Sequence, residues 1–147
     1  QFLGHKDRHI RYAARIALEH QPVEQWQNCV LFEKDPTTLI TSGIALARNG
    51  TPTFKTPLLN TLKNIDWKAL SETQKKDLLR LYQLVFIRLG KPTDLERLNI
   101  LAQINKAYPS QNSFMNRELS RVFPKTECRY RQTNRGADKK SFPRNGR

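Results

Sequence analysis

An apolar stripe with helical spacing follows Asp7 and is the clearest pattern in the chain. Its members stand at positions i, i+3, i+4, i+7 and i+8, and they are Ile10, Ala13, Ala14, Ala17 and Leu18. An aspartate before such a stripe is a favoured N-cap, because its carboxylate accepts a hydrogen bond from a free N–H of the first turn. The pattern predicts a helix that begins after Asp7 and ends at Gln21-Pro22.

Two further helices are each introduced by a proline, which suits the first position of a helix because it has no N–H to leave unsatisfied. The second helix is predicted over Pro22–Glu33, with the apolar positions Val23, Trp26, Cys29 and Val30. Asp35 and Pro36 then repeat the signal of an acidic cap followed by proline. The third helix is predicted to run to Asn49-Gly50 on the stripe Leu39, Gly43, Leu46 and Ala47.

The next segments predict a shorter fourth helix and a turn. The fourth helix covers Thr53–Lys63, and its apolar positions are Leu58, Leu59 and Leu62. In the following linker, over residues 64–70, we expect Trp67 and Leu70 to fill the gap between helix pairs.

Capping boxes introduce the last two long helices. Ser71 with Gln74 opens a helix that Gly90 ends, and its apolar face consists of Leu78, Leu81, Tyr82, Val85, Phe86 and Leu89. Thr93 with Glu96 opens a helix over residues 94–106, and a final helix is expected over residues 113–122. No segment alternates between apolar and polar residues as a strand does, so the sequence predicts an all-α fold.

The net charge of +13 is concentrated at the C-terminal end. From Lys125 onward there are eight basic residues and two acidic ones, so these 23 residues supply +6 of the total. They show no apolar periodicity, and we expect a helical domain over residues 1–123 followed by a disordered basic tail over residues 124–147. The helical part is therefore only mildly basic, which weakens the case for nucleic-acid binding.

The chain contains an internal repeat. A shift by 28 positions places Asp7 on Asp35 and Leu18 on Leu46, and each of these helices is followed by a turn and a second amphipathic helix. A helix pair that recurs at such a period is typical of a stacked array, because one pair cannot bury its apolar face alone. The sequence predicts a helical-repeat solenoid of about three helix pairs and a final helix.

The segment Asp7–Leu18 carries the pattern Asp-x-x-Ile-Arg-x-Ala-Ala-x-x-Ala-Leu, which resembles the first helix of HEAT repeats of the phycobilisome-lyase-like type. Residues 35–63 resemble a weaker second copy, with Leu39 where the family has arginine, and residues 71–106 are a third pair on architecture alone. The resemblance implies a HEAT-like solenoid in which Asp7, Arg11 and Asp35 join neighbouring repeats.

A narrower resemblance extends over residues 7–118, through the stretches 7–19, 66–90 and 116–119. They are similar to HEAT segments of large multidomain proteins of planctomycete-type bacteria, which combine such a segment with a sugar-dehydrogenase-like propeller and a c-type cytochrome domain. The chain is then expected to be part of a longer, exported protein. In that setting, the helical segment is a spacer or docking surface and the redox chemistry belongs to other domains.

The residues that carry chemistry form no recognisable catalytic or metal-binding pattern. His5 and His9 are four residues apart and His20 follows, but the expected cap Asp7 places His5 before the helix, so we expect no metal site. Cys29 stands within an apolar stripe, which predicts a buried, unreactive thiol. We therefore predict no catalytic residue and no cofactor, and the acids Asp77 and Glu96 have no partner at a readable spacing.

Three aromatic residues allow an alternative function. Trp26, Trp67 and Tyr82 could stack on bases, with Asp66 as an acid, in a nucleic-acid binder similar to HEAT-like DNA glycosylases. Their positions within apolar stripes instead favour a role in the core. A bilin-lyase activity has only the analogy of fold behind it.

The preferred prediction is a non-catalytic scaffold or protein-interaction module whose partner is another protein or a neighbouring domain. HEAT-like arrays generally line their concave side with the second helix of each pair. The candidate interaction surface on those helices is Gln25, Lys55, Lys63, Arg97 and Lys106. No apolar run approaches the roughly 20 residues needed to span a bilayer.

Overall fold

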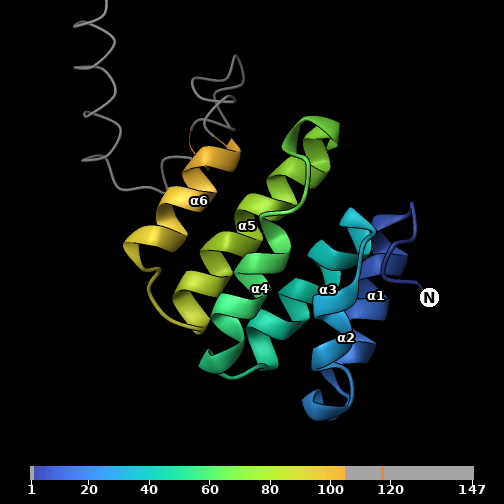
Figure 1. Cartoon of the computed structure of the whole chain (residues 1–147). Helices are drawn as coiled ribbons and strands as arrows, with labels where there is room; N and C mark the ends of the chain where they lie inside the picture. Colours follow the sequence, from blue (N-terminus) through green and yellow to red (C-terminus); the bar gives the residue numbers. More distant parts are fainter. Residues whose placement is uncertain (1, 105–116, 118–147) are drawn as a thin grey trace, which may run out of the picture.

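The structure is a computed structural model that describes residues 2–104 and residue 117 (Figure 1). The α-helices of this part are α1 (Arg8–Glu19), α2 (Gln27–Phe32), α3 (Pro36–Asn49), α4 (Lys55–Leu62), α5 (Glu72–Arg88) and α6 (Asp94–Ile104). Short 3-10 helices precede or link them: η1 (Val23–Gln25), η2 (Pro52–Phe54) and η3 (Trp67–Ala69). No strand occurs within these residues, so the predicted all-α class is confirmed there.

The helix starts lie where the capping residues predict them. The Asp7 carboxylate accepts a hydrogen bond from the His9 N–H at 2.8 Å, and the Asp35 carboxylate accepts one from the Thr38 N–H at 2.8 Å. Both capping boxes are also formed, by Ser71 with Gln74 and by Thr93 with Glu96. Local side-chain chemistry therefore sets these helix boundaries.

The predicted second helix is interrupted at Trp26, which separates η1 from α2. Trp26 leaves helical geometry, with φ −129° and ψ −15°, and its ring is buried in the core. Its indole N–H donates to the carbonyl oxygen of Gln21 at 3.3 Å. Burying this large ring stabilises the fold more than continuing a short helix would.

The predicted fourth helix likewise starts as the 3-10 helix η2 and becomes α-helical at Lys55. Pro57 then lies in the first turn of α4. No intrahelical N–H donor is needed there, so the proline is accommodated without a lost hydrogen bond.

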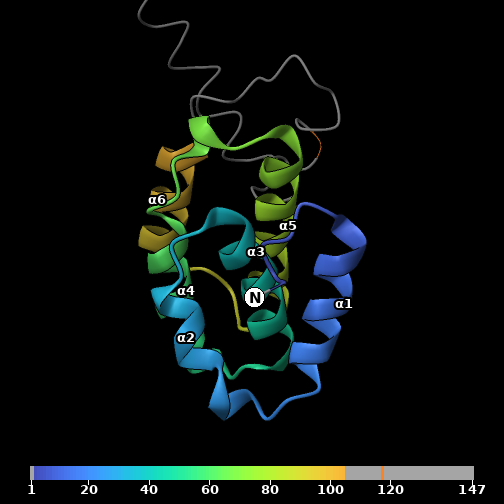
Figure 2. The same cartoon turned by 90° about the vertical axis from the view of Figure 1, so that its right-hand side faces the viewer.

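The helices are arranged in two layers (Figures 1 and 2). In one layer α1 packs on α3 and α3 packs on α5, and in the other α2 packs on α4. Helix α6 extends the second layer, because Glu96 of α6 accepts a hydrogen bond from the Thr56 hydroxyl of α4 at 2.7 Å. The helices α1, α3 and α5 run in the same direction, so their N-terminal ends share one edge of the molecule.

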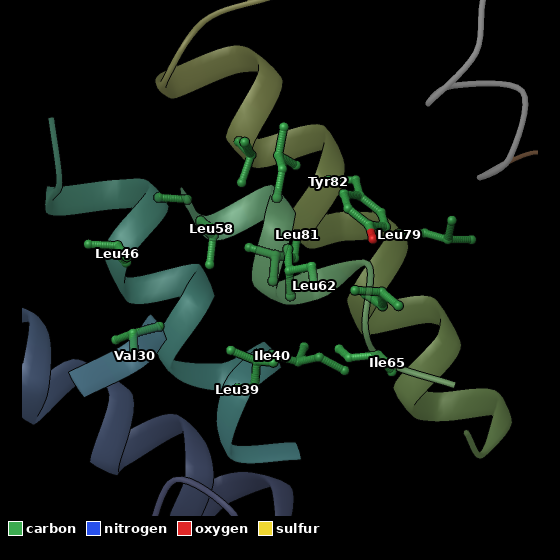
Figure 3. Packing of buried hydrophobic residues seen from close by; sticks show 14 of the residues in the cluster. Val30, Leu39, Ile40, Leu46, Leu58, Leu62, Ile65, Leu79, Leu81 and Tyr82 are labelled. Atoms are coloured by element: carbon green, nitrogen blue, oxygen red, sulfur yellow. The ribbon is translucent and has the colours of Figure 1, made fainter. Parts of the chain in front are cut away.

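Helix α3 lies at the centre of the apolar core. Its residues from Leu39 to Leu46 are nearly all buried, and they meet leucines from α4 and α5 (Figure 3). A Cβ atom added to Gly43 would lie 2.9 Å from Leu81 Cδ2 and 3.6 Å from Leu58 Cδ1. The absence of a side chain at Gly43 therefore lets α4 and α5 both approach α3 closely.

One polar network lies at the edge of this core and connects α6 to the two preceding helices. The fully buried Tyr82 hydroxyl donates to Gln103 Oε1 at 2.6 Å. The Nε2 amide of Gln103 donates to the carbonyl oxygens of Leu62 and Ile65, each at 2.9 Å. The buried hydroxyl and two backbone carbonyls near the end of α4 are thus satisfied by one side chain.

Helix α1 buries less of its apolar stripe than the core helices do. None of its residues is fully buried, Ile10 is 39% exposed, and Ala13 and Ala17 are exposed. The reason is that α1 lies at the end of its layer and packs mainly against α3, so only one side of the helix is covered.

The predicted burial of the Cys29 thiol is wrong, because Cys29 is exposed. Trp26 and Val30 occupy the buried positions of this short segment. Cys29 is one residue from Val30, and consecutive helical residues are about 100° apart around the axis, so its side chain turns outward.

Two predicted segments fall outside the described residues. They are the helix over residues 113–122, of which only Arg117 is described, and the disordered tail over residues 124–147.

Replacing Gly43 tests the close packing around α3. Gly43→Val should lower the free energy of unfolding by about 1–3 kcal/mol, because its methyl groups would displace Leu81 and Leu58 in a filled core. Gly43→Ala is the matched control, in which a helix-propensity gain of about 1 kcal/mol offsets the smaller shift of Leu81. Urea unfolding followed by circular dichroism measures both, and a Gly43→Val midpoint equal to that of Gly43→Ala would contradict this account.

Alkaline unfolding tests the burial of Tyr82. Burial raises the pKa of the Tyr82 hydroxyl far above its usual value, and the hydrogen bond with Gln103 only partly opposes this. The folded state therefore retains a proton that the unfolded chain releases near pH 10, so stability present below about pH 10 is lost as the pH rises.

In Tyr82→Phe this part of the pH dependence should disappear. The variant should lose about 1 kcal/mol at neutral pH, because Gln103 Oε1 loses its donor. Its unfolding free energy should then fall less steeply than that of the wild type above about pH 10. Parallel slopes for the two proteins in denaturant titrations would show that Tyr82 is not the group responsible.

Candidate binding cleft

A polar cleft of about 450 Å³ opens between the loop that precedes α1 and the N-terminal halves of α3 and α5. Three segments that are distant in the sequence meet there, because α1, α3 and α5 begin at the same edge (Figure 2). Among the lining residues with polar side chains are His5, Lys6, Arg11, Thr37, Gln74 and Asp77.

Arg11 holds the loop in place over the cleft. Its Nη1 atom donates to the carbonyl oxygen of His5 at 2.7 Å and to that of Lys6 at 3.0 Å. The Asp7 N–H donates to His5 Nδ1 at 3.0 Å, which fixes the orientation of the imidazole. The guanidinium therefore has a defined position, with its backbone acceptors in the loop and its side chain in the wall of the cleft.

Gly4 brings the same loop against the start of α3. A Cβ atom at this position would lie 2.5 Å from Thr38 Oγ1 and 3.1 Å from Asp35 Oδ2. Both of these atoms are fixed, because Thr38 donates to Asp35 through its backbone N–H and its hydroxyl, each at 2.8 Å. Only glycine permits this approach without moving the cap of α3.

The floor of the cleft is formed by a contact between α3 and α5. Gln74 Nε2 donates to Thr37 Oγ1 at 2.8 Å. The Thr41 hydroxyl, one turn along α3, donates to the carbonyl oxygen of Thr37 at 2.8 Å. These bonds satisfy the polar groups beneath the opening and fix the spacing of the two helices.

Two cationic side chains, those of Lys6 and Arg11, line the cleft beside one carboxylate, that of Asp77. Burial raises the pKa of Asp77, and four cationic side chains oppose that rise: Arg80, Arg11, Arg8 and Lys76. The nearest contact is between Arg80 Nη1 and Asp77 Oδ1 at 3.7 Å, and the Asp77 side chain remains 33% exposed. Positive charges outnumber the carboxylate, and the N-terminal ends of α3 and α5 add the positive ends of their dipoles.

The residues predicted as an interaction surface lie elsewhere, in or beside the second layer. Gln25 and Lys63 are exposed, and Arg97 on α6 is half-buried. Lys55 is engaged within the fold, with its Nζ atom 3.1 Å from a carboxylate oxygen of Glu96 and 2.9 Å from the carbonyl oxygen of Lys91. Lys106 lies outside the described residues.

Besides its capping-box partner Thr93, Glu96 has two partners that its sequence context did not reveal, Thr56 and Lys55. Burial alone would raise its pKa, but hydrogen bonds from the Thr93 N–H, the Thr56 hydroxyl and the Lys55 ammonium group outweigh this effect, and the pKa is lowered. Glu96 thus connects the start of α6 to the start of α4. Lys55 and Glu96 are 41 positions apart, so no local spacing could have predicted the pair.

The residues predicted to join neighbouring repeats make their hydrogen bonds locally. Asp7 and Asp35 cap their own helices, and Arg11 binds the loop of its own helix. The bonds between α1 and α3 come instead from Glu19, whose carboxylate lies 3.1 Å from Arg48 Nε and whose carbonyl accepts from Asn49 Nδ2 at 2.7 Å. Arg11 and Asp35 still border the junction, through the cleft and through the contact with Gly4.

A second, less polar cleft of about 530 Å³ lies between the C-terminal ends of α2 and α4. Its edge carries Phe32, whose side chain is 81% exposed. The carboxylates of Glu33 and Asp66 border it, but both accept hydrogen bonds from nearby backbone N–H groups. Its lining includes a single cation, Lys34, whereas Lys6 and Arg11 both line the first cleft.

The aromatic residues and the acid that the sequence offered for nucleic-acid binding have roles in the fold. Trp26, Trp67 and Tyr82 are buried at exposures of 8%, 7% and 0%, as the core interpretation predicts, and are not available to stack on bases. Asp66 caps η3 by accepting from the Lys68 N–H at 3.0 Å. Within residues 2–104 and 117, no group of three or more His, Cys, Asp or Glu side chains could hold a metal ion.

Comparison of the chain with known protein families, with curated proteins and with solved structures finds no match. In the part of the chain that the structure describes, no helix has the length and apolar character required to cross a membrane.

Substitution of Arg11 tests how the cleft is organised. Arg11→Gln should lower the free energy of unfolding by about 1–2 kcal/mol, because two backbone carbonyls lose a charged donor. Backbone amides of residues 4–7 should exchange faster with deuterium, while those of α5 keep their protection. Arg15→Gln, which removes the same charge one turn further along α1, is the control and should leave the loop unchanged.

Proposed function

We propose that the chain is a HEAT-like helical-repeat segment that acts as a non-catalytic protein-interaction module. The observation that carries this proposal is the two-layer order of the helices, in which α1, α3 and α5 pack in sequence and α2 and α4 do the same beside them. Consecutive pairs stacked in this way extend an exposed surface without enclosing a reaction pocket. The repeat of 28 residues between Asp7 and Asp35 and the resemblance of Asp7–Leu18 to HEAT repeats support the same conclusion.

Exposed apolar side chains also support an interaction role. Phe32, Ile87, Leu95 and Leu98 lie on helices and are between 62% and 81% exposed. A partner protein or a neighbouring domain of a longer chain is the kind of molecule that would cover them. Two surfaces are candidates for binding a specific partner: the polar cleft, and the second-layer surface at Gln25, Lys63 and Arg97.

Photo-crosslinking tests whether the chain contacts a specific protein. A photoreactive phenylalanine analogue is introduced at Lys6 beside the cleft, at Lys63 in the second layer, or at the exposed Arg88 as the control. In an extract of the source cells, one of the first two positions should give a discrete protein adduct and Arg88 should not. Equal, diffuse labelling from all three positions would contradict a specific interaction surface.

Nucleic-acid binding is the competing function, because the net charge of +13 favours phosphate contacts. The salt dependence of the affinity for duplex DNA distinguishes DNA binding by the helical body from attraction to the basic segment 125–147. We expect any DNA affinity to be lost when the eight basic residues of the segment 125–147 are replaced by glutamine in the full-length chain. A steep salt dependence that survives this replacement would favour a DNA-reading helical body.

A further inference from the structure

The cleft beside α1 presents cationic donors that the fold does not use. Only the Nη1 atom of Arg11 donates hydrogen bonds to the loop carbonyls. The guanidinium makes no other hydrogen bond with the described residues. Lys6 is exposed, and its ammonium group forms no ion pair within the same part of the chain. Both side chains line one cavity, so an anion placed there could accept from both.

The carboxylate of Asp77 restricts which anion fits. It lines the same cleft and is one third exposed, so a dianionic phosphate would bring two negative charges toward a third. A single carboxylate would meet less repulsion than a dianionic phosphate. An N–H donor beside that carboxylate would give Asp77 a hydrogen bond in addition to its ion pair with Arg80. A carboxylate next to an N–H donor is what an aspartate or glutamate in a peptide offers.

The cleft is also shaped before any ligand arrives. Gly4 packs against the cap of α3, Arg11 holds the loop carbonyls, and Gln74 bonds to Thr37 across the floor. Its volume of about 450 Å³ and its open side suit a side chain and the adjoining peptide units of an extended segment. The entropy cost of ordering the cleft on binding is therefore small.

We propose that this cleft binds an acidic segment of a partner protein, with a side-chain carboxylate between Lys6 and Arg11 and a peptide N–H donating to Asp77. This inference rests on the proposed interaction function and names the chemistry of the partner. Recognition of an acidic motif by positioned cations follows the same physical rule as other charge-assisted peptide recognition.

The test is a titration of the full-length chain with an uncharged-ended peptide that alternates glutamate and serine, compared with its glutamine counterpart. Binding is followed residue by residue, through amide chemical shifts in NMR, because the basic segment 125–147 could also attract the peptide. The glutamate peptide should shift the amides of residues 4–11, 37–41 and 71–77, and the glutamine peptide should not. Shifts confined to residues 124–147 would overturn the proposal.

Matched charge variants make the test specific. Lys6→Gln should weaken binding at the cleft about threefold to fivefold at low salt, because one exposed cation contact is lost. Arg88→Gln removes the same charge from the exposed C-terminal end of α5 and should leave the affinity unchanged. Equal weakening by both variants would reveal general attraction to a basic protein, and would contradict a defined site.

Asp77→Asn separates a peptide from a simple anion. The asparagine oxygen still accepts an N–H, so the glutamate peptide should bind with similar or slightly higher affinity, while inorganic phosphate should gain most from loss of the negative charge. Phosphate that binds the wild-type cleft more tightly than the peptide would overturn the assignment of a peptide ligand. A partner crosslinked only from Lys63 would leave the interaction function standing and refute the cleft as its site.

Discussion

The described fold depends on the close approach of three helices at Gly43. Helix α3 packs against the other helices of its own layer and against those of the second layer. At Gly43, leucines from α4 and α5 reach the α3 backbone because no side chain stands between them. Burial of the surrounding leucines provides the main apolar stabilisation, and it requires this spacing. Helix α3 is covered on several sides, whereas α1 is covered on one. The two layers, the edge at which α1, α3 and α5 begin, and the cleft at that edge follow from this arrangement.

The sequence predicted the elements well where the chemistry is local. Asp7, Asp35, Ser71 and Thr93 each mark a helix start within one turn, because a cap and the N–H group that it satisfies are two or three residues apart. The burial of Trp67 and Leu70 between helix pairs was also predictable, since large apolar residues in a short linker have few other places to go. The helix interruption at Trp26 was not, because it depends on where the ring finds space in the folded core.

The candidate site could not be predicted from local patterns. Lys6, Thr37 and Asp77 belong to three helix starts that come together only when α1, α3 and α5 lie side by side. Asp77 was recognisable only as an acid without a partner, and Lys55 as an exposed cation, although the fold pairs Lys55 with Glu96. Sequence periodicity identifies the face of a helix that is buried, but it does not identify which residues from different helices will share a cavity.

Gln103 gives the junction between the second and third helix pairs a property that apolar packing alone would lack. Its amide can satisfy the Tyr82 hydroxyl and the two carbonyls only in one orientation and at one height along α4. Leucine ridges permit neighbouring helices to slide by small steps, whereas a slip of α6 by one residue would rotate this side chain by about 100° and leave three polar groups without partners. The register of α6 against α4 and α5 is therefore fixed by hydrogen bonding as well as by apolar packing.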